Sequence, residues 1–408
     1  MKQNQVSLKK KAMAWILSIC LIVTLIPDIS FAVTGSEKND VITSENTEGN
    51  KIVEKNEDTT VYDLGDGEQM AVLHGSQVRY KNEQDNLVDY DPSLVEIKDG
   101  EKSEQGIPLD GYAYKNSQGD KKQYIPEMLS EEIPILMESK EYSIEIIPTD
   151  DTVKKAGIEK SVVKIEKEKV IDTYENDKTK ELPIKAVYGT KDDDLVFSCA
   201  SGEHGIKQTI FLDEDSENNS FEYKIKSGGL EAKKNVTNEG IVFTEPDTEE
   251  IVAFIAPPLM TDASEEICSE NITYELREDM NEEGTYVLVV TIDESYFDDE
   301  TRKYPVAVDL AVIWADASRI NDVYVANDMH EDINFYDSGA TVMPAGKNST
   351  GSYETYIKFP GLQSAVSGKS ISEAKFIVYE AEGSESKQNA GVYKAEEGWT
   401  ESDLKYSN

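Results

Sequence analysis

The side chains with the clearest binding chemistry lie in two extended runs near the end of the chain, residues 355–359 and 374–379. Successive side chains of a strand point to opposite faces, so each run places Tyr and Lys on one face and apolar residues on the other. Aromatic rings stack on sugar faces, and lysines can pair with uronic carboxylates. The alternative is that Tyr and Lys are simply common on exposed strand faces. The candidate glycan-binding residues are Tyr356, Lys358, Lys375 and Tyr379.

Catalytic chemistry has little support in the sequence. The three histidines, His74, His204 and His330, lie far apart, and we expect each to be a solvent-exposed turn residue rather than a catalytic base. No nucleophile elbow, zinc-binding helix or glycine-rich phosphate loop occurs. Carboxylates are so abundant that counting them neither identifies nor excludes a glycosidase pair. We predict no catalytic residue and no enzymatic activity.

Two acidic runs, Asp192–Asp194 and Asp213–Glu217, have the oxygen-rich composition that calcium prefers. Neither matches an EF-hand loop, and we interpret both as solvated turns, with Ca²⁺ binding as the alternative. No metal site and no cofactor is predicted. Beyond residue 32 the cysteines are Cys199 and Cys268, which either form one disulfide or stay free.

The charge of the chain restricts its partners. Lysine and arginine number 41 against 81 acidic residues, a net charge of -40. Nucleic acid is excluded as a direct ligand, because a binding surface must neutralise phosphates with basic side chains. A polyanionic wall polymer would also be repelled unless a cation bridges the two surfaces. An acidic surface otherwise serves solubility.

The first 32 residues have the pattern of a secretory signal peptide. Lys9–Lys11 precede an uncharged apolar run, Ala12–Ile26, and Ser30-Phe31-Ala32 supplies small residues for cleavage after Ala32. The run is shorter than the roughly 20 residues needed to span a bilayer. We therefore expect a secreted protein with no membrane segment after cleavage.

The rest of the sequence predicts an all-β protein made of short strands separated by turns. Gln77–Tyr80 and Leu87–Tyr90 form one expected hairpin. The sequence of Tyr80–Gln84 is nearly repeated at Tyr114–Gln118, which indicates a second hairpin. The apolar residues of Val162–Glu175 fit neither the 3.6-residue period of a helix nor the two-residue period of a strand, and we favour strand over helix. Further expected strands are Leu195–Cys199, Gln208–Leu212, Phe221–Ile225, Gly240–Phe243, Ile251–Ile255 and Thr285–Ile292.

These signals give four expected segments. A signal peptide covers residues 1–32 and a disordered acidic linker covers 33–59, which lacks aromatic residues. A β-sandwich region covers 60–310, with a subdomain break near residue 135. A second β-module covers 319–408, where strands are expected at Asp322–Val325, Thr355–Phe359 and Ala374–Tyr379. The oligomeric state is left open.

The sandwich region resembles the N-terminal part of secreted, wall-associated Rhs/YD-repeat proteins between about residues 187 and 309. The residues that carry the resemblance are Gly205–Gln208, Ala256–Ala263 and Tyr304–Asp309. The last element departs from the family's Pro-Val-Thr-Ile-Asp-Pro, since Ala307, Val308 and Leu310 replace Thr, Ile and the final Pro. The resemblance implies that the chain is associated with the cell wall and is the front portion of a larger, polymorphic-toxin-like protein.

The last module resembles the DNRLRE domain, the family 96 carbohydrate-binding module. The residues that carry this resemblance are Asp322–Val325, Tyr356–Phe359, Ile371–Phe376, Gly391–Tyr393 and Trp399-Thr400. The family's six-letter motif is missing, and its closing strands are expected beyond Asn408, so the module is interpreted as truncated. The resemblance implies a partial jelly-roll-like sandwich that binds polysaccharide or a cell-wall glycan. The alternative function is a structural adhesin or display scaffold without glycan binding.

Overall fold

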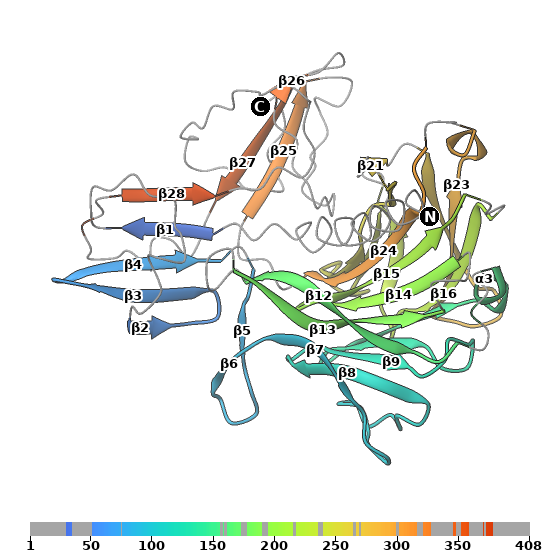
Figure 1. Ribbon diagram of the computed structural model, residues 1–408, viewed down its shortest axis with the longest axis horizontal. Coiled ribbons are helices and arrows are strands. Elements are labelled where there is room, and N and C mark those ends of the chain that lie inside the picture. Colours follow the sequence, from blue (N-terminus) through green and yellow to red (C-terminus); the bar gives the residue numbers. More distant parts are fainter. Residues whose placement is uncertain are drawn as a thin grey trace, which may run out of the picture. The chain divides into compact units, whose positions relative to one another are not determined.

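The computed structural model describes residues 30–34, 51–74, 76–155, 158, 161–172, 178–189, 195–214, 218–235, 240–263, 267–268, 271–298, 302–315, 321–327, 346–347, 352–358, 370 and 373–377. The described residues divide into two compact units. The first draws on 89–170 and 180–316, and the second on 24–88, 171–179 and 317–408. Both consist of antiparallel sheets, so the expected all-β class is confirmed (Figure 1).

One layer of the first unit is an eight-stranded sheet of order β22-β23-β16-β11-β10-β9-β8-β7. Buried and partly exposed residues alternate along several of its strands. In β16, for example, buried Phe221, Tyr223 and Ile225 alternate with partly exposed residues. In chain order the strands are β7 (Asp91–Glu96), β8 (Tyr112–Gln118), β9 (Lys122–Pro126), β10 (Ile135–Glu138), β11 (Ser143–Pro148), β16 (Ser220–Lys226), β22 (Ile272–Glu278) and β23 (Thr285–Ile292).

The other layer is a ten-stranded sheet with the main order β12-β13-β14-β15-β24-β19-β18-β17, and β20 and β21 continue from β24. In chain order the strands are β12 (Lys164–Asp172), β13 (Lys178–Tyr188), β14 (Leu195–Ser201), β15 (Gly205–Leu212), β17 (Glu231–Lys234), β18 (Ile241–Thr244), β19 (Ile251–Ile255), β20 (Leu259–Thr261), β21 (Ile267–Cys268) and β24 (Val306–Trp314).

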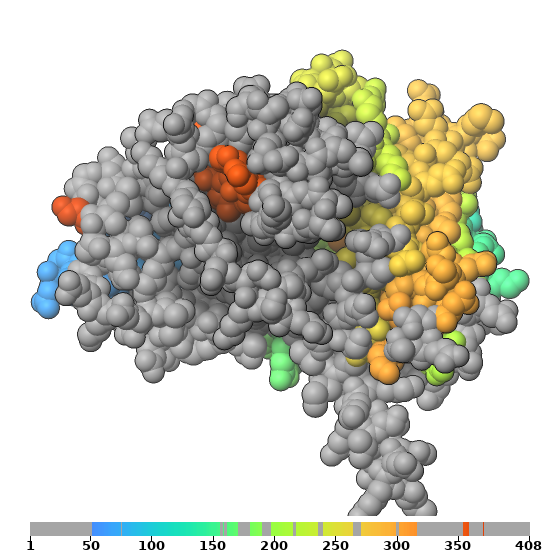
Figure 2. All heavy atoms as spheres, turned by 90° about the horizontal axis from the view of Figure 1, so that it is seen from above, coloured from blue at the N-terminus to red at the C-terminus, as the bar shows by residue number. Residues whose placement is uncertain are grey.

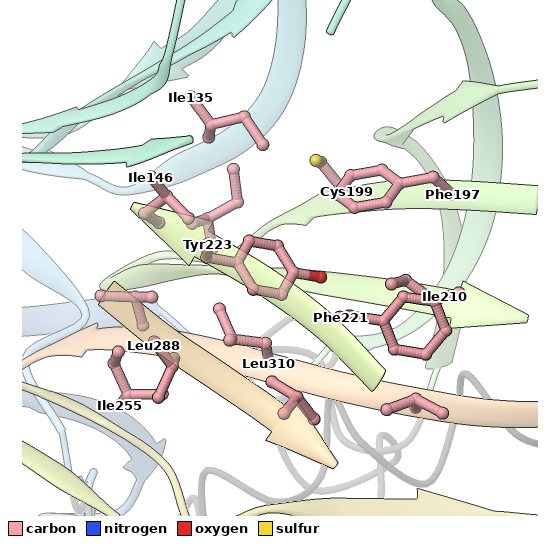
Figure 3. Packing of buried hydrophobic residues seen from close by; sticks show 14 of the residues in the cluster. Ile135, Ile146, Phe197, Cys199, Ile210, Phe221, Tyr223, Ile255, Leu288 and Leu310 are labelled. Atoms are coloured by element: carbon pink, nitrogen blue, oxygen red, sulfur yellow. The ribbon is translucent and has the colours of Figure 1, made fainter. Parts of the chain in front are cut away.

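A single large apolar core joins these two sheets. Figure 3 shows side chains of both sheets meeting there, with Tyr223 and Leu288 from one sheet and Phe197, Ile210 and Leu310 from the other. Sequence-distant strands therefore share one buried interior. Burial of this apolar area is the main favourable term in folding the unit.

β24 brings the three motifs of the Rhs resemblance together. It pairs with β15 on one side, where Thr209 lies opposite Asp309, and with β20 on the other, where Leu259 lies opposite the same residue. The quoted stretches are thus neighbours in one sheet, although about one hundred residues separate the first from the last.

Most strands of this unit lie where the sequence placed them. β19 and β23 match their expected ranges. β12 confirms strand over helix for 164–172 of the stretch 162–175, whose last three residues lie outside the described residues. The break expected near residue 135 falls at the start of β10, which pairs with both β9 and β11 in one continuous sheet.

Two short helical elements were not expected. α3 (Asp150–Lys155) has acidic residues in its first turn and basic ones in its last, which suits the helix dipole. The 3₁₀ turn η1 (Glu294–Tyr296) is capped by Asp293, which accepts a hydrogen bond from the Ser295 amide. Neither, nor any other helix in the described ranges, is long and apolar enough to cross a membrane.

The second unit contains three small sheets. The first has order β2-β3-β4-β1-β28, the second has order β25-β27-β26, and the third is the hairpin of β5 and β6. The hairpin confirms the expected pairing around residues 82–86. The strands are β1 (Ser30–Thr34), β2 (Lys51–Lys55), β3 (Thr59–Gly65), β4 (Glu68–Leu73), β5 (Arg79–Lys81), β6 (Leu87–Asp89), β25 (Asn321–Asn327), β26 (Gly346–Lys347), β27 (Ser352–Lys358) and β28 (Glu373–Ile377).

β1 lies across the predicted signal cleavage site. It pairs with β4 and with β28, so that Val33 lies opposite both Ala71 and Ala374. Residues 51–55 of the predicted linker form β2, which pairs with β3. β25 covers the first strand-like run expected in the last module, and β27 and β28 cover the described parts of the other two, of which residues 359 and 378–379 lie outside the described residues.

Candidate carbohydrate-binding site

The central strand of the three-stranded sheet, β27, carries the first half of the predicted glycan-binding set. β27 pairs with β25 along seven residues and with β26 along two. Tyr356 lies opposite Val323 and Lys358 lies opposite Asn321 in the register with β25. Cross-strand partners share a face, so these four positions belong to one side of the sheet.

Three polar side chains occur in alternate positions on that side of β27. Glu354 and Lys358 are exposed and Tyr356 is half-buried. The Tyr356 hydroxyl donates a hydrogen bond to Oε2 of Glu354 at 3.0 Å. Figure 2 shows the 354–358 segment, coloured orange-red, open at the molecular surface. The face thus presents an aromatic ring between an anionic acceptor and a cationic donor.

The second half of the predicted set lies elsewhere. Lys375 is in β28, which belongs to the five-stranded sheet and pairs with β1, with Ala32 opposite Lys375. Tyr379 lies outside the described residues. The structure therefore brings Tyr356 and Lys358 together on one strand and places Lys375 in a different sheet. The four-residue site stays a prediction.

Glu354 is the residue of this face that the sequence reasoning missed. The alternation Glu354-x-Tyr356-x-Lys358 was visible in the sequence, but the expected strand began at Thr355. Ile357, expected on the apolar face, is only half-buried. With Glu354 included, the face carries both signs of charge and is less selective for an acidic ligand than a Tyr/Lys face alone.

The expectation of exposed histidines is wrong for His204. His204 is buried in the turn between β14 and β15, which is closed by a hydrogen bond from Gly202 N to the Gly205 carbonyl at 2.8 Å. Its ring meets the ring of Tyr90 edge-on, with centroids 4.8 Å apart. The turn has a polar sequence, yet its histidine packs against Tyr90, the residue directly before β7 of the facing sheet.

The same expectation is wrong for His74, which follows β4 and is also buried. Burial lowers the pKa of His74 to about 4, and the nearby Arg79 charge acts in the same direction. An imidazole with this pKa is neutral at pH 7 and stays neutral well below it. His330 lies outside the described residues.

Other candidate groups give no site in the described part of the chain. Cys199 is a free, buried thiol, and burial raises its pKa far above the usual range. Among the residues that can be described, no group of three or more His, Cys, Asp or Glu side chains is arranged to hold a metal ion. Asp192–Asp194 and most of Asp213–Glu217 lie outside the described residues.

Comparison with known proteins identifies the C-terminal segment. Residues 314–408 match carbohydrate-binding module family 96. This range includes β25, β26, β27 and β28, and begins at Trp314, the last residue of β24. No curated protein and no solved structure matches the chain. The match indicates a carbohydrate-binding module at this end, a type of domain that binds without catalysing.

Proposed function

We propose that the protein is a secreted, wall-associated, non-catalytic protein that binds polysaccharide through residues 314–408. The observation that carries the proposal is the family 96 match over a segment in which strand β27 places exposed Glu354 and Lys358 on either side of half-buried Tyr356 on one face. In the proposed site the Tyr356 ring stacks on a sugar, Glu354 accepts from sugar hydroxyls and Lys358 donates to them.

The charges decide between neutral and acidic glycans. Lys358 favours a uronic carboxylate, whereas Glu354 on the same face and the net charge of -40 oppose one. Because long-range repulsion is screened by salt and contact ion pairs are weakened by it, salt separates the two cases. Binding of a polyuronate that strengthens with salt shows that repulsion dominates, and binding that weakens shows that the Lys358 contact does.

The test is binding of the full chain to neutral, uronic and wall polysaccharides, with and without Ca²⁺. An aromatic contact contributes about 0.5–1.5 kcal/mol. Since 1.4 kcal/mol is a factor of ten, Tyr356→Ala should weaken binding by up to about tenfold. Tyr80→Ala removes a half-buried ring from the β5–β6 hairpin and serves as the matched control, with affinity unchanged.

Two results would contradict the proposal. Absence of binding to every polysaccharide class, in both calcium conditions, would favour the adhesin or display-scaffold function. Release of sugar products by the purified chain would show that the protein is an enzyme.

The larger context is also a proposal. We infer that the sandwich unit is the front portion of an Rhs/YD-repeat-type protein, which is supported by the side-by-side arrangement of the three motif stretches in β15, β20 and β24. The reading frame downstream of residue 408 in the encoding DNA tests this, because an Rhs-type protein would continue into Tyr-Asp repeats.

A further inference from the structure

One face of the ten-stranded sheet carries buried charges beside a small apolar cluster of Val187, Phe211 and Ala307. Along β15, Ile206, Gln208 and Ile210 point toward the main core, so Lys207 and Thr209 lie on the opposite face. The charged residues of this face with little solvent exposure are Glu168 on β12, Lys185 on β13, Lys207 on β15 and Asp309 on β24.

Lys207 and Asp309 are diagonal neighbours on adjacent antiparallel strands. Thr209 lies directly opposite Asp309, and Lys207 is two positions before Thr209. The Lys207 Nζ atom is 3.6 Å from Oδ1 of Asp309, and the two side chains are only 12% and 5% exposed. The amine is therefore held against the carboxyl group with little water between them.

The carboxyl group of Asp309 is also polarised asymmetrically. Its Oδ1 accepts a hydrogen bond of 2.6 Å from the Thr209 hydroxyl, while Oδ2 is buried and has no hydrogen-bond partner among the described residues. A donor fixed at one oxygen stabilises negative charge that develops there during attack on the carbonyl carbon. The unpaired oxygen is the one free to leave.

We propose that Lys207 and Asp309 form an intramolecular amide cross-link between β15 and β24. Proton transfer from Nζ to the Asp309 carboxylate gives a neutral amine and a neutral acid, which a buried site favours over two charges. The Nζ lone pair attacks Cγ, the Cγ–Oδ2 bond breaks, and Oδ2 leaves as water with two protons from the amine and the acid. Atoms balance without an oxidant or another reactant.

Burial is the main factor that favours the neutral form of the Lys207 amine. Burial lowers the pKa of Lys207, while the Asp309 and Glu168 carboxylates act in the opposite direction. Glu168 has a buried oxygen, Oε2, that has no hydrogen-bond partner in the described part of the chain. This carboxylate is the candidate proton carrier between Nζ and the leaving oxygen.

The second buried ion pair of this face, Lys185 and Glu168, is the alternative candidate for a cross-link. Lys185 Nζ is 3.0 Å from Oε1 of Glu168, and both side chains are buried. However, the Lys185 ammonium also lies 5.4 Å from the centre of the Phe211 ring, which stabilises the cation, and a cation has no lone pair for attack. The geometry thus favours Lys207 and Asp309 as the reacting pair.

The experiment is intact-mass measurement of the purified full chain under denaturing conditions, with its N-terminus sequenced. The expected mass is lower than the sequence mass by one water. Tryptic peptides should show no cleavage after Lys207 and one branched peptide that joins Lys207 to Asp309. Lys207→Arg should restore the full mass, and Asp309→Asn should give the same link with loss of ammonia in place of water.

A water-accessible ion pair provides the matched control. Lys224 Nζ is 2.6 Å from Oε2 of Glu131, closer than the proposed pair, but both side chains are about one-third exposed. Trypsin should cleave after Lys224 as usual. A full-length mass with normal cleavage after Lys207, a mass deficit that persists in Lys207→Arg, or a link mapped to Lys185 and Glu168 would overturn the proposal.

Discussion

At the scale of single residues, the structure uses polar side chains in the interior more than the sequence suggested. His74, His204 and Gln208 are all buried, and Asn116 is buried while bridging its own hairpin turn to Lys121 O and Gln123 N. Asn82, the corresponding residue of the similar stretch 80–84, instead lies within its turn and accepts hydrogen bonds from the backbone amides of Gln84 and Asn86. The same residue type therefore forms turn-stabilising hydrogen bonds from different positions in the two hairpins.

His74 gives a prediction about pH. Its folded pKa of about 4 lies below the value of 6.5 in the unfolded chain, so the unfolded chain binds the proton more tightly. Stability is then fully present above pH 6.5 and is lost as the pH falls toward 4. At 1.36 kcal/mol per pKa unit, the wild type should lose about 3 kcal/mol more than His74→Asn between pH 7 and pH 4.

Urea unfolding of both proteins at several pH values measures this difference. Comparing the two proteins cancels the contribution to the unfolding free energy from carboxylates that titrate in the same pH range. Parallel loss of unfolding free energy in wild type and variant would show that His74 is already accessible to protons in the folded protein.

At the scale of elements, alternation of apolar and polar residues located the strands. At the start of β15, close contact with the backbone of β24 also requires a glycine. Gly205 opens β15 opposite Ile313 of β24. A Cβ atom at this glycine would collide with the Val312 carbonyl oxygen and lie 2.9 Å from the Ile313 Cα. Both atoms are backbone, so neither can rotate away as a side chain could.

Gly205→Ala should therefore destabilise the sandwich unit by about 3 kcal/mol, the upper end of typical overpacking. Gly284→Ala is the control in the same unit. Its backbone is left-handed, with a φ of 73°, but nothing lies within 4 Å of its Cβ position. That change should cost only about 1–2 kcal/mol. Thermal unfolding ranks the two, and equal losses would show that β15 and β24 can separate without penalty.

At the scale of the whole molecule, the predicted signal peptide would connect export with the fold. Cleavage after Ala32 would remove Ser30, Phe31 and Ala32 from β1 and leave Val33 and Thr34 to pair with β28. The strand would then contribute little to its sheet. If the leader is retained, β1 stays whole between β4 and β28.

N-terminal sequencing of protein recovered from the growth medium should give Val33 as the first residue. Ala32→Arg places a large cation at a position that signal peptidases require to be small, so the variant should keep its leader. Mature protein that begins at Met1 would contradict the prediction and would favour an intact β1.

Much of the organisation was accessible from sequence. Period-two alternation found β19 and β23 at their observed limits, and the residues around Asp322, Tyr356 and Phe376 indicated a carbohydrate-binding module that the family match supports. The sequence could not place β28 beside β1, because pairing between segments about 340 residues apart leaves no local signal. The three predicted binding residues that the structure describes, Tyr356, Lys358 and Lys375, are therefore divided between two sheets.

The sequence by itself determined the all-β class, the positions of most strands and the acidic charge, because these follow from local alternation and from composition. Only the tertiary structure decided which strands far apart in the sequence are neighbours. That decision buried His74 and His204, brought β15, β20 and β24 together, and set Lys207 against Asp309. The physical reason is that burial and charge pairing depend on contacts across the sheets, which residues far apart in the chain make only after folding.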